Sequence, residues 1–189
     1  MRVLIGCEFS GVIREAFAKR GHDAWSCDLI PTICEGKHIQ DDVLKHLNDG
    51  WNLFIVHPVC TYLSFVGTRH WNKVGREAKR LAAFDFFMKC VNAPIEKICV
   101  ENPVGYPNIT YRKPDQIIHP YYFGESVQKR TCLWLKNLPL LEYSDTIIEK
   151  PKPLYFLKTN GKAINWVEGI KGVKNRSQAR SISFVSIAN

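Results

Sequence analysis

The sequence predicts an α/β domain with a mostly parallel sheet and helices on both of its faces. Two observations lead to this prediction. Short apolar runs alternate with amphipathic segments over residues 2–103, which is the pattern of successive strand–helix–strand units. The chain has 189 residues, 46% of them apolar, which is enough for one domain with a proper core and short for two.

Each expected element in this region follows from a local signal. Strands are expected at residues 2–6, 23–28, 52–57 and 97–102, and helices at 12–21, 41–47 and 76–91. Gly21 ends the first helix, and acidic residues begin the second, where the helix dipole favours them. Apolar residues recur at helical spacing in the third helix. Pro103 stops the last of these strands.

The pattern changes after Pro103. Short strands are expected within residues 111–125, 129–135 and 152–159, among prolines and aromatic residues. Residues 158–181 are polar, basic and punctuated by glycine, so a long loop is expected there. Loops of this length in compact domains are usually functional or mobile.

Composition bounds the class of protein. The sequence has no apolar run of 18 residues and no signal-peptide pattern, so we expect a soluble, intracellular, cytoplasmic protein without a membrane span. Its seven cysteines form an odd set without a Cys-x-x-Cys pair. This argues against a disulfide framework and a zinc ribbon, and no metal site is expected. Cys7, Cys27, Cys90 and Cys99 lie in apolar surroundings and are expected in the core.

The charge distribution points to a polyanionic partner. The net charge is +8, and residues 135–189 carry 9 Lys and Arg against 4 Asp and Glu. A basic C-terminal region suits a nucleic acid.

Chemically useful residues follow the expected strands. Ligands of doubly wound sheets bind beyond the carboxyl ends of the strands, and these ends deliver residues 7–11, Asp28, residues 57–64 and Glu101. Asp28 suits ribose hydroxyls, although an acid there also caps turns. Neither G-x-G-x-x-G nor G-x-x-x-x-G-K-[ST] occurs, so no pyrophosphate or P-loop site is indicated.

Cys60 is the candidate nucleophile. A cysteine is often only a small hydrophobic residue, but Pro58 stiffens the loop that presents this one just beyond a buried strand. Reactivity requires an electropositive setting that favours the thiolate. Arg69 and Arg130 are the candidates for it.

Six short motifs occur in the order of a known family. They are "CEFSG" at 7–11, Asp28, "DDV" at 41–43, "PVC" at 58–60, "EN" at 101–102 and "KR" at 129–130. The chain thereby resembles the cytosine-5 DNA methyltransferases, most closely the small stand-alone members encoded by phages. The resemblance covers nearly the whole chain and implies a Rossmann-like, S-adenosylmethionine-dependent methyltransferase fold.

The resemblance also implies a cofactor site. S-adenosylmethionine would lie against Phe9, Ser10 and Gly11. Asp28 would take its ribose hydroxyls and Asp42 its adenine amino group, and His57 is assigned to the same site.

The remaining motifs imply the chemistry. Cys60 would attack C6 of a cytosine turned out of the DNA helix. Glu101, as a carboxylic acid whose pKa burial raises, would bond N3. Arg130 would steady the flipped base, and Asn102 would hold the loops together.

The same comparison divides the chain into three parts. Residues 1–134 form the catalytic core, 135–175 a small basic target-recognition region that includes Tyr155, Phe156 and Trp166, and 176–189 a C-terminal segment returning to the core. Val59 stands where the family has proline before the nucleophile, and Gly11 is alone where the family has a glycine pair.

Three alternatives stay open at this point. Val59 and a C-terminal end that is short for the family leave open a catalytically impaired DNA- or cofactor-binding relative. RNA or a nucleotide is an alternative substrate, because the same thiol chemistry acts on any accessible pyrimidine. A cysteine hydrolase is disfavoured, since a phosphatase of the Cys-x5-Arg type would need arginine at Val66.

Overall fold

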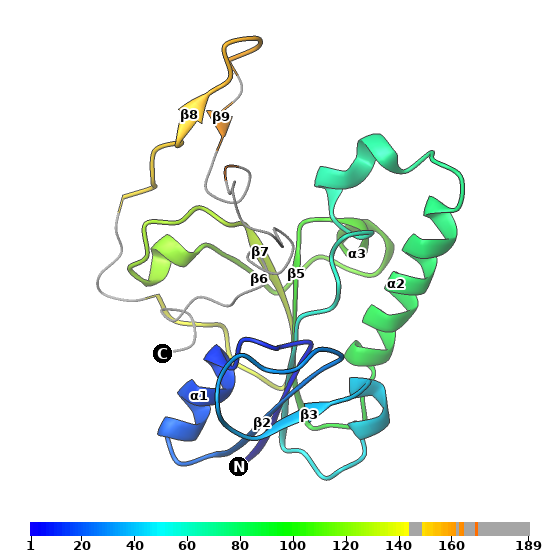
Figure 1. Cartoon of the computed structure of the whole chain (residues 1–189), viewed down its shortest axis with the longest axis vertical. Coiled ribbons are helices and arrows are strands. Elements are labelled where there is room, and N and C mark those ends of the chain that lie inside the picture. Colours follow the sequence, from blue (N-terminus) through cyan, green and yellow to red (C-terminus); the bar gives the residue numbers. More distant parts are fainter. Residues whose placement is uncertain (144–148, 162, 165–168, 170–189) are drawn as a thin grey trace.

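The protein contains a seven-stranded sheet of order β3-β2-β1-β4-β5-β7-β6 and a separate hairpin of β8 and β9 (Figure 1). The computed structural model describes residues 1–143, 149–161, 163–164 and 169. The elements are β1 (Arg2–Gly6), α1 (Val12–Lys19), β2 (Asp23–Asp28), β3 (His38–Gln40), η1 (Val43–His46), β4 (Leu53–Val56), η2 (Phe65–His70), α2 (Arg76–Val91), β5 (Lys97–Pro103), α3 (Tyr106–Thr110), β6 (Gln116–Ile118), η3 (Pro120–Phe123), β7 (Thr131–Lys136), β8 (Tyr155–Phe156) and β9 (Ala163–Ile164).

The two long helices cover opposite faces of this sheet. Side chains alternate along a strand, and in β1 Val3 and Ile5 pack with Ile13 of α1, whereas Leu4 packs in the cluster that contains Phe87 of α2. Figure 1 shows α1 (blue) and α2 (green) on either side of the strands. The predicted α/β architecture with a mostly parallel sheet is therefore confirmed.

The strand order reverses beside β1. Strand β1 pairs in parallel with β2 on one side and with β4 on the other. The carboxyl ends of β1 and β4 therefore lie at a topological switch point, where ligands of doubly wound sheets bind. The residues that follow these strands are those singled out in the sequence.

Strand β7 breaks the parallel pattern. It runs antiparallel to β5, with Thr131 opposite Pro103 and Leu133 opposite Glu101. The beginning of β7 therefore lies at the same edge of the sheet as the carboxyl end of β5. Residues 129–130, which precede β7, are brought to that edge by this pairing.

Local predictions were accurate where the signal was periodic. The helix predicted at 76–91 is α2, and the strand predicted at 2–6 is β1. The short helix predicted at 41–47 is η1, a 3-10 helix of four residues that Asp42 caps. The three-residue strand β3 was not predicted, since so short a polar segment shows no alternation.

The predicted buried cysteines lie inside the fold. Cys27 and Cys90 are buried, and Cys7 and Cys99 are partly buried. At the other end of the chain, β9 interrupts the loop predicted at 158–181. Most of that loop, Trp166 and the segment 176–189 lie outside the described residues. No helix in the described part of the chain is long and apolar enough to cross a membrane.

Candidate active site

The loop after β1 is closed around the start of α1 by Glu8. The buried Glu8 carboxylate accepts hydrogen bonds from the backbone N–H groups of Ile13 (2.8 Å) and Arg14 (3.3 Å), and from the Ser10 hydroxyl (3.3 Å). A helix N-terminus attracts anions, and here a side chain of the protein already supplies one. Glu8 was not identified from the sequence, although an acid just before a helix is a recognisable signal.

Gly11 is required where this loop enters the helix. It precedes α1 with φ of 72° and ψ of 1°, which is the left-handed conformation that glycine adopts without strain. A Cβ atom there would lie 2.6 Å from a guanidinium nitrogen of Arg14. The backbone therefore requires glycine at this position, and the place of Gly11 against a cofactor stays a prediction.

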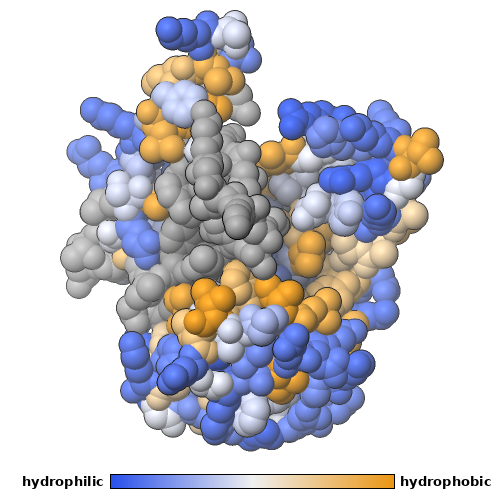
Figure 2. Space-filling model, viewed as in Figure 1, coloured by the Kyte–Doolittle hydropathy of each residue, from blue (hydrophilic) through white to orange (hydrophobic). Residues whose placement is uncertain are grey.

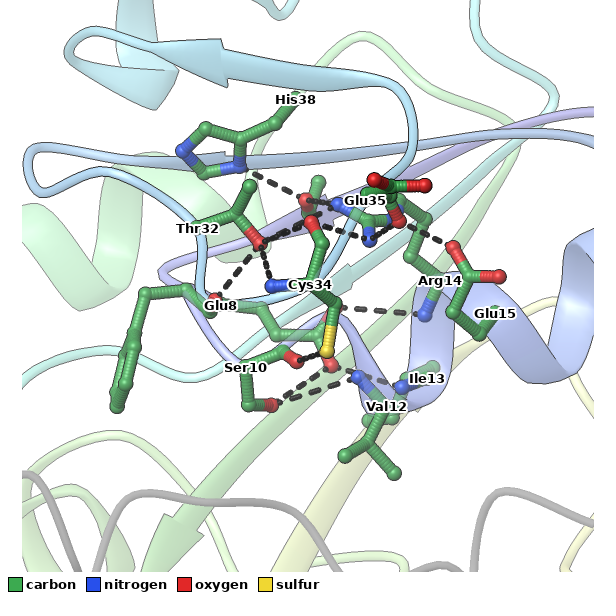
Figure 3. A network of polar contacts seen from close by, with 12 residues as sticks. Glu8, Ser10, Val12, Ile13, Arg14, Glu15, Thr32, Cys34, Glu35 and His38 are labelled. Carbon is green, nitrogen blue, oxygen red and sulfur yellow. Dashed lines mark hydrogen bonds and ion pairs between the residues drawn. The ribbon is translucent and has the colours of Figure 1, made fainter.

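Arg14 holds the loop that follows β2 against α1 (Figure 3). Its side chain is fully buried and donates hydrogen bonds to Ser26 Oγ (3.0 Å) and to the carbonyl oxygens of Cys34 (3.3 Å) and Glu35 (2.6 Å). These bonds tie residues 29–36 to α1. The sequence analysis missed Arg14, because an arginine in an amphipathic helix ordinarily faces solvent.

Asp28 is the last residue of β2, and Asp42 is the N-cap of η1. Burial is the largest cause that raises the pKa of the Cys7 thiol well above its usual value, and the charges of Asp28 and Asp42 raise it further. Asp28 accepts a hydrogen bond from the backbone N–H of Ile30 (3.2 Å), and Asp42 accepts one from that of Leu44 (3.0 Å). The charges of both predicted carboxylates therefore act on the same thiol.

The loop after β1 and the loop after β2 hold each other. The Phe9 carbonyl accepts a hydrogen bond from Thr32 Oγ1 (2.9 Å), and the Ser10 carbonyl accepts one from Cys34 Sγ (3.0 Å). Phe9 and Ser10 are buried, while Leu29 and Ile33 are 72% and 66% exposed. Apolar side chains and carboxylates at one strand edge suit a ligand that carries hydroxyl donors, a positive charge and an apolar ring.

The loop after β4 presents Cys60. The buried Asn102 side chain donates a hydrogen bond to the Pro58 carbonyl (2.8 Å), so the prediction that Asn102 holds the loops together is confirmed. The Cys60 carbonyl accepts hydrogen bonds from the N–H groups of Leu63 (3.0 Å) and Ser64 (2.9 Å), which form a turn. Cys60 itself is exposed. This geometry supports a presented thiol over a buried one.

A second contact fastens the same loop. The Tyr106 N–H donates to the Leu63 carbonyl (2.7 Å), and the Phe65 N–H donates to the Val104 carbonyl (3.2 Å). Between them Gly105 lies so close that a Cβ atom would overlap the Leu63 carbonyl group. Gly105 is a further site residue that the sequence did not reveal, because only the tertiary approach of two backbones requires it.

Glu101 lies between two cationic side chains. Its Oε2 is 2.6 Å from His57 Nδ1, and its Oε1 is 3.7 Å from Lys129 Nζ. Burial alone would raise the pKa of Glu101, but the charges of Lys129 and His57 outweigh it and lower that pKa to about 2. The expectation that burial keeps Glu101 protonated is therefore wrong for this state of the protein.

His57 and Arg130 have different neighbours at this edge of the sheet. His57, predicted to bind the cofactor, directs its imidazole to Glu101. Arg130 is exposed just before β7, and its charge contributes, after burial, to lowering the pKa of His119. The arginine that contacts the Cys60 loop is Arg76, whose Nη2 donates to the Thr61 carbonyl (2.8 Å).

The predicted residues thus form two neighbouring groups. The ends of β1, β2 and β3 carry Phe9, Ser10, Gly11, Asp28 and Asp42, and the ends of β4, β5 and β7 carry His57, Cys60, Glu101 and Arg130. Within the described ranges, no three His, Cys, Asp or Glu side chains form a group that could hold a metal ion.

Comparison with solved structures finds 48 chains that are similar to this one. A solved E. coli structure, described as a proposed DNA modification methyltransferase encoded within a prophage, aligns with a TM-score of 0.47 and 12% sequence identity. The alignment covers 71% of this chain and 46% of that chain, so this chain spans less than half of that protein. No family model and no curated protein matches the sequence. The residues at the strand ends therefore provide the basis for a proposed function.

Proposed function

We propose that this protein methylates C5 of cytosine in DNA, with S-adenosylmethionine as the methyl donor and Cys60 as the covalent nucleophile. The observation that carries the proposal is the 2.8 Å hydrogen bond from Asn102 to the Pro58 carbonyl. It fastens the loop of the thiol to the residue next to Glu101. A nucleophile and an acid at one strand edge are what addition to a pyrimidine ring requires.

The residues at the ends of β1 to β3 suit the cofactor. In the proposal Asp28 accepts hydrogen bonds from the ribose hydroxyls and Asp42 from the adenine amino group, while Phe9, Ser10 and Gly11 form the floor. Glu8 fills the start of α1, which favours a cofactor without phosphate groups. S-adenosylmethionine carries no phosphate, and when bound it supplies the methyl group that C5 takes.

Cytosine C5 is a poor nucleophile, so the protein must first activate the ring. The Cys60 thiolate adds to C6, Glu101 bonds N3 of the electron-rich ring, and Arg130 steadies the base. Val59 lacks the fixed φ of proline, but Asn102 and the close approach of Gly105 hold this loop from both sides. These contacts favour an active enzyme over an impaired relative.

Two basic surfaces suit DNA. The segment after Cys60 carries five cationic residues, Arg69, Lys73, Arg76, Lys79 and Arg80. The guanidinium groups of Arg76 and Arg80 lie 4.4 Å and 4.6 Å from the ring centres of Tyr62 and Trp71, respectively. The β8–β9 hairpin exposes apolar side chains (Figure 2), with Tyr155 39% and Phe156 61% exposed beside Lys152 and Lys158. Lysines suit phosphates, and exposed aromatic rings suit bases.

The test is mass spectrometry of nucleosides from DNA that lacks 5-methylcytosine, after incubation with S-adenosylmethionine and the protein. We expect 5-methylcytosine with the wild type and none with Cys60→Ala, while calorimetry shows that Cys60→Ala still binds the cofactor. Cys99→Ala is the matched control, because burial raises the pKa of that thiol to about 12 and keeps it unreactive. Equal product from the wild type and Cys60→Ala, or none from either, refutes the proposal.

A further inference from the structure

We propose that His57 is the proton source for Glu101 when Cys60 adds to the cytosine ring, a role that rests on the function proposed above. This role resolves a conflict between the chemistry required of Glu101 and the charges around it. Glu101 must offer a proton to N3, yet the structure surrounds it with positive charge.

The position of His57 suits this role. Its backbone N–H donates to the Gly6 carbonyl (3.0 Å), which fixes the residue at the point where the strand order reverses. Its Nδ1 lies 2.6 Å from Glu101 Oε2, and the side chains of His57 and Glu101 are 17% and 21% exposed. Buried His57 Nε2 has no hydrogen-bond partner among the described residues. The imidazole is thus directed at the carboxylate through one nitrogen.

The charges around His57 favour its protonated form. Burial is the largest single cause acting on the pKa of His57, and it lowers that pKa. The charge of Glu101, the hydrogen bond to Glu101 and the charge of Glu8 together outweigh burial and the repulsion by Lys129, so the net shift is upward. The pKa of Glu101 is about 2. The contact therefore favours the form of the pair in which His57 holds the proton and Glu101 is a carboxylate.

Lys129 is the other cation beside Glu101, and it is a poorer donor. Its Nζ lies 3.7 Å from Glu101 Oε1, whereas His57 Nδ1 lies 2.6 Å from Glu101 Oε2. An ordinary lysine also releases its proton about four pKa units less readily than a histidine. The 2.6 Å contact of His57 makes it the direct donor, and Lys129 stabilises the resting carboxylate.

The proton transfer balances without another reactant. A lone pair of the Cys60 thiolate forms the S–C6 bond, and the π electrons of the C5–C6 bond move through the ring toward N3. The His57 Nδ1–H bond breaks with its electrons left on Nδ1, the proton joins the Glu101 carboxylate, and the resulting carboxylic acid donates a proton to N3. When the thiol leaves, the proton returns by the same route.

The first experiment reads the proton directly and needs no enzymatic turnover. Nitrogen-15 NMR of the His57 imidazole is followed from pH 5 to 10 in the wild type and in Glu101→Gln. We expect the wild-type His57 to titrate above the ordinary value of 6.5 and the Glu101→Gln protein to titrate lower. A wild-type midpoint at or below the ordinary value overturns the proposal.

The second experiment measures the addition step with DNA that carries tritium at cytosine C5, because reversible addition at C6 releases this hydrogen to water. His57→Asn keeps an N–H group near the Nδ1 position but cannot titrate. We expect it to be about 100-fold slower, within the range of general acid catalysis, and to lose the decline in rate that the wild type shows as the pH rises through the pKa of His57. His46→Asn, at a partly buried histidine (23% exposed) paired with Asp49 (3.0 Å), should match the wild type.

The outcomes separate the two proposals. A His57→Asn protein with the rate and pH profile of the wild type, in a preparation where Cys60→Ala is inactive, overturns the role of His57 and leaves the proposed function intact. A wild-type protein that neither methylates DNA nor releases tritium overturns the proposed function and the role of His57 with it. The NMR titration reports the charge of the pair in either case.

Discussion

Replacing Arg14 by methionine tests whether one buried side chain holds residues 29–36 against α1. Methionine keeps most of the length and removes every donor. Hydrogen bonds from a charged group contribute about 1.5–3 kcal/mol each. Ser26 Oγ is buried and cannot gain water, whereas the carbonyls of Cys34 and Glu35 lie in an exposed loop and can be rehydrated when it moves. We therefore expect a loss of about 3–5 kcal/mol in the free energy of unfolding, the range for a broken buried ionic network.

The assay is urea denaturation, read as a fall in the midpoint at unchanged slope, together with amide hydrogen exchange. Exchange should accelerate most in residues 29–36. Arg20→Met is the matched control on the same helix, because Arg20 is exposed and should change stability by no more than about 0.5 kcal/mol. A loss below 1 kcal/mol in Arg14→Met, with unchanged exchange in residues 29–36, would refute the reasoning.

Two further predictions follow from the site. Gly105→Ala should push the Leu63 backbone away and slow methylation about 100-fold, since small misplacements of a nucleophile are costly. Gly67→Ala is the control, because a Cβ atom at Gly67 would have no neighbour closer than 3.5 Å. Equal methylation rates of the two variants would contradict the prediction. The His57–Glu101 pair makes stability depend on pH in two ranges. The pKa of Glu101 is lowered, so the contribution of Glu101 to the free energy of unfolding is lost as the pH falls from 4.5 toward 2. The pKa of His57 is raised, so the contribution of His57 is lost as the pH rises beyond 6.5. The stability advantage of the wild type over His57→Asn should therefore be larger at pH 5.5 than at pH 9.5, and urea denaturation that shows equal differences would oppose this.

The sequence by itself determined the features that depend on residues close together in the chain. Helix α2 was predicted with its observed bounds, because apolar spacing over 16 residues is a local signal. The exposed position of Cys60 after a buried strand was also readable, since Pro58 and the apolar run precede it directly.

Only the tertiary structure decided how the residues at the strand ends act on one another. Glu101 is ionised because antiparallel β7 brings Lys129 beside it and because β4 pairs next to β5, which places His57 at its other side. Arg14 is buried because residues 29–36 fold back over α1. Gly105 is required because two backbones meet there. Charge, burial and close approach arise between residues far apart in the chain, so a reading of local patterns finds the candidates but not their protonation or their neighbours.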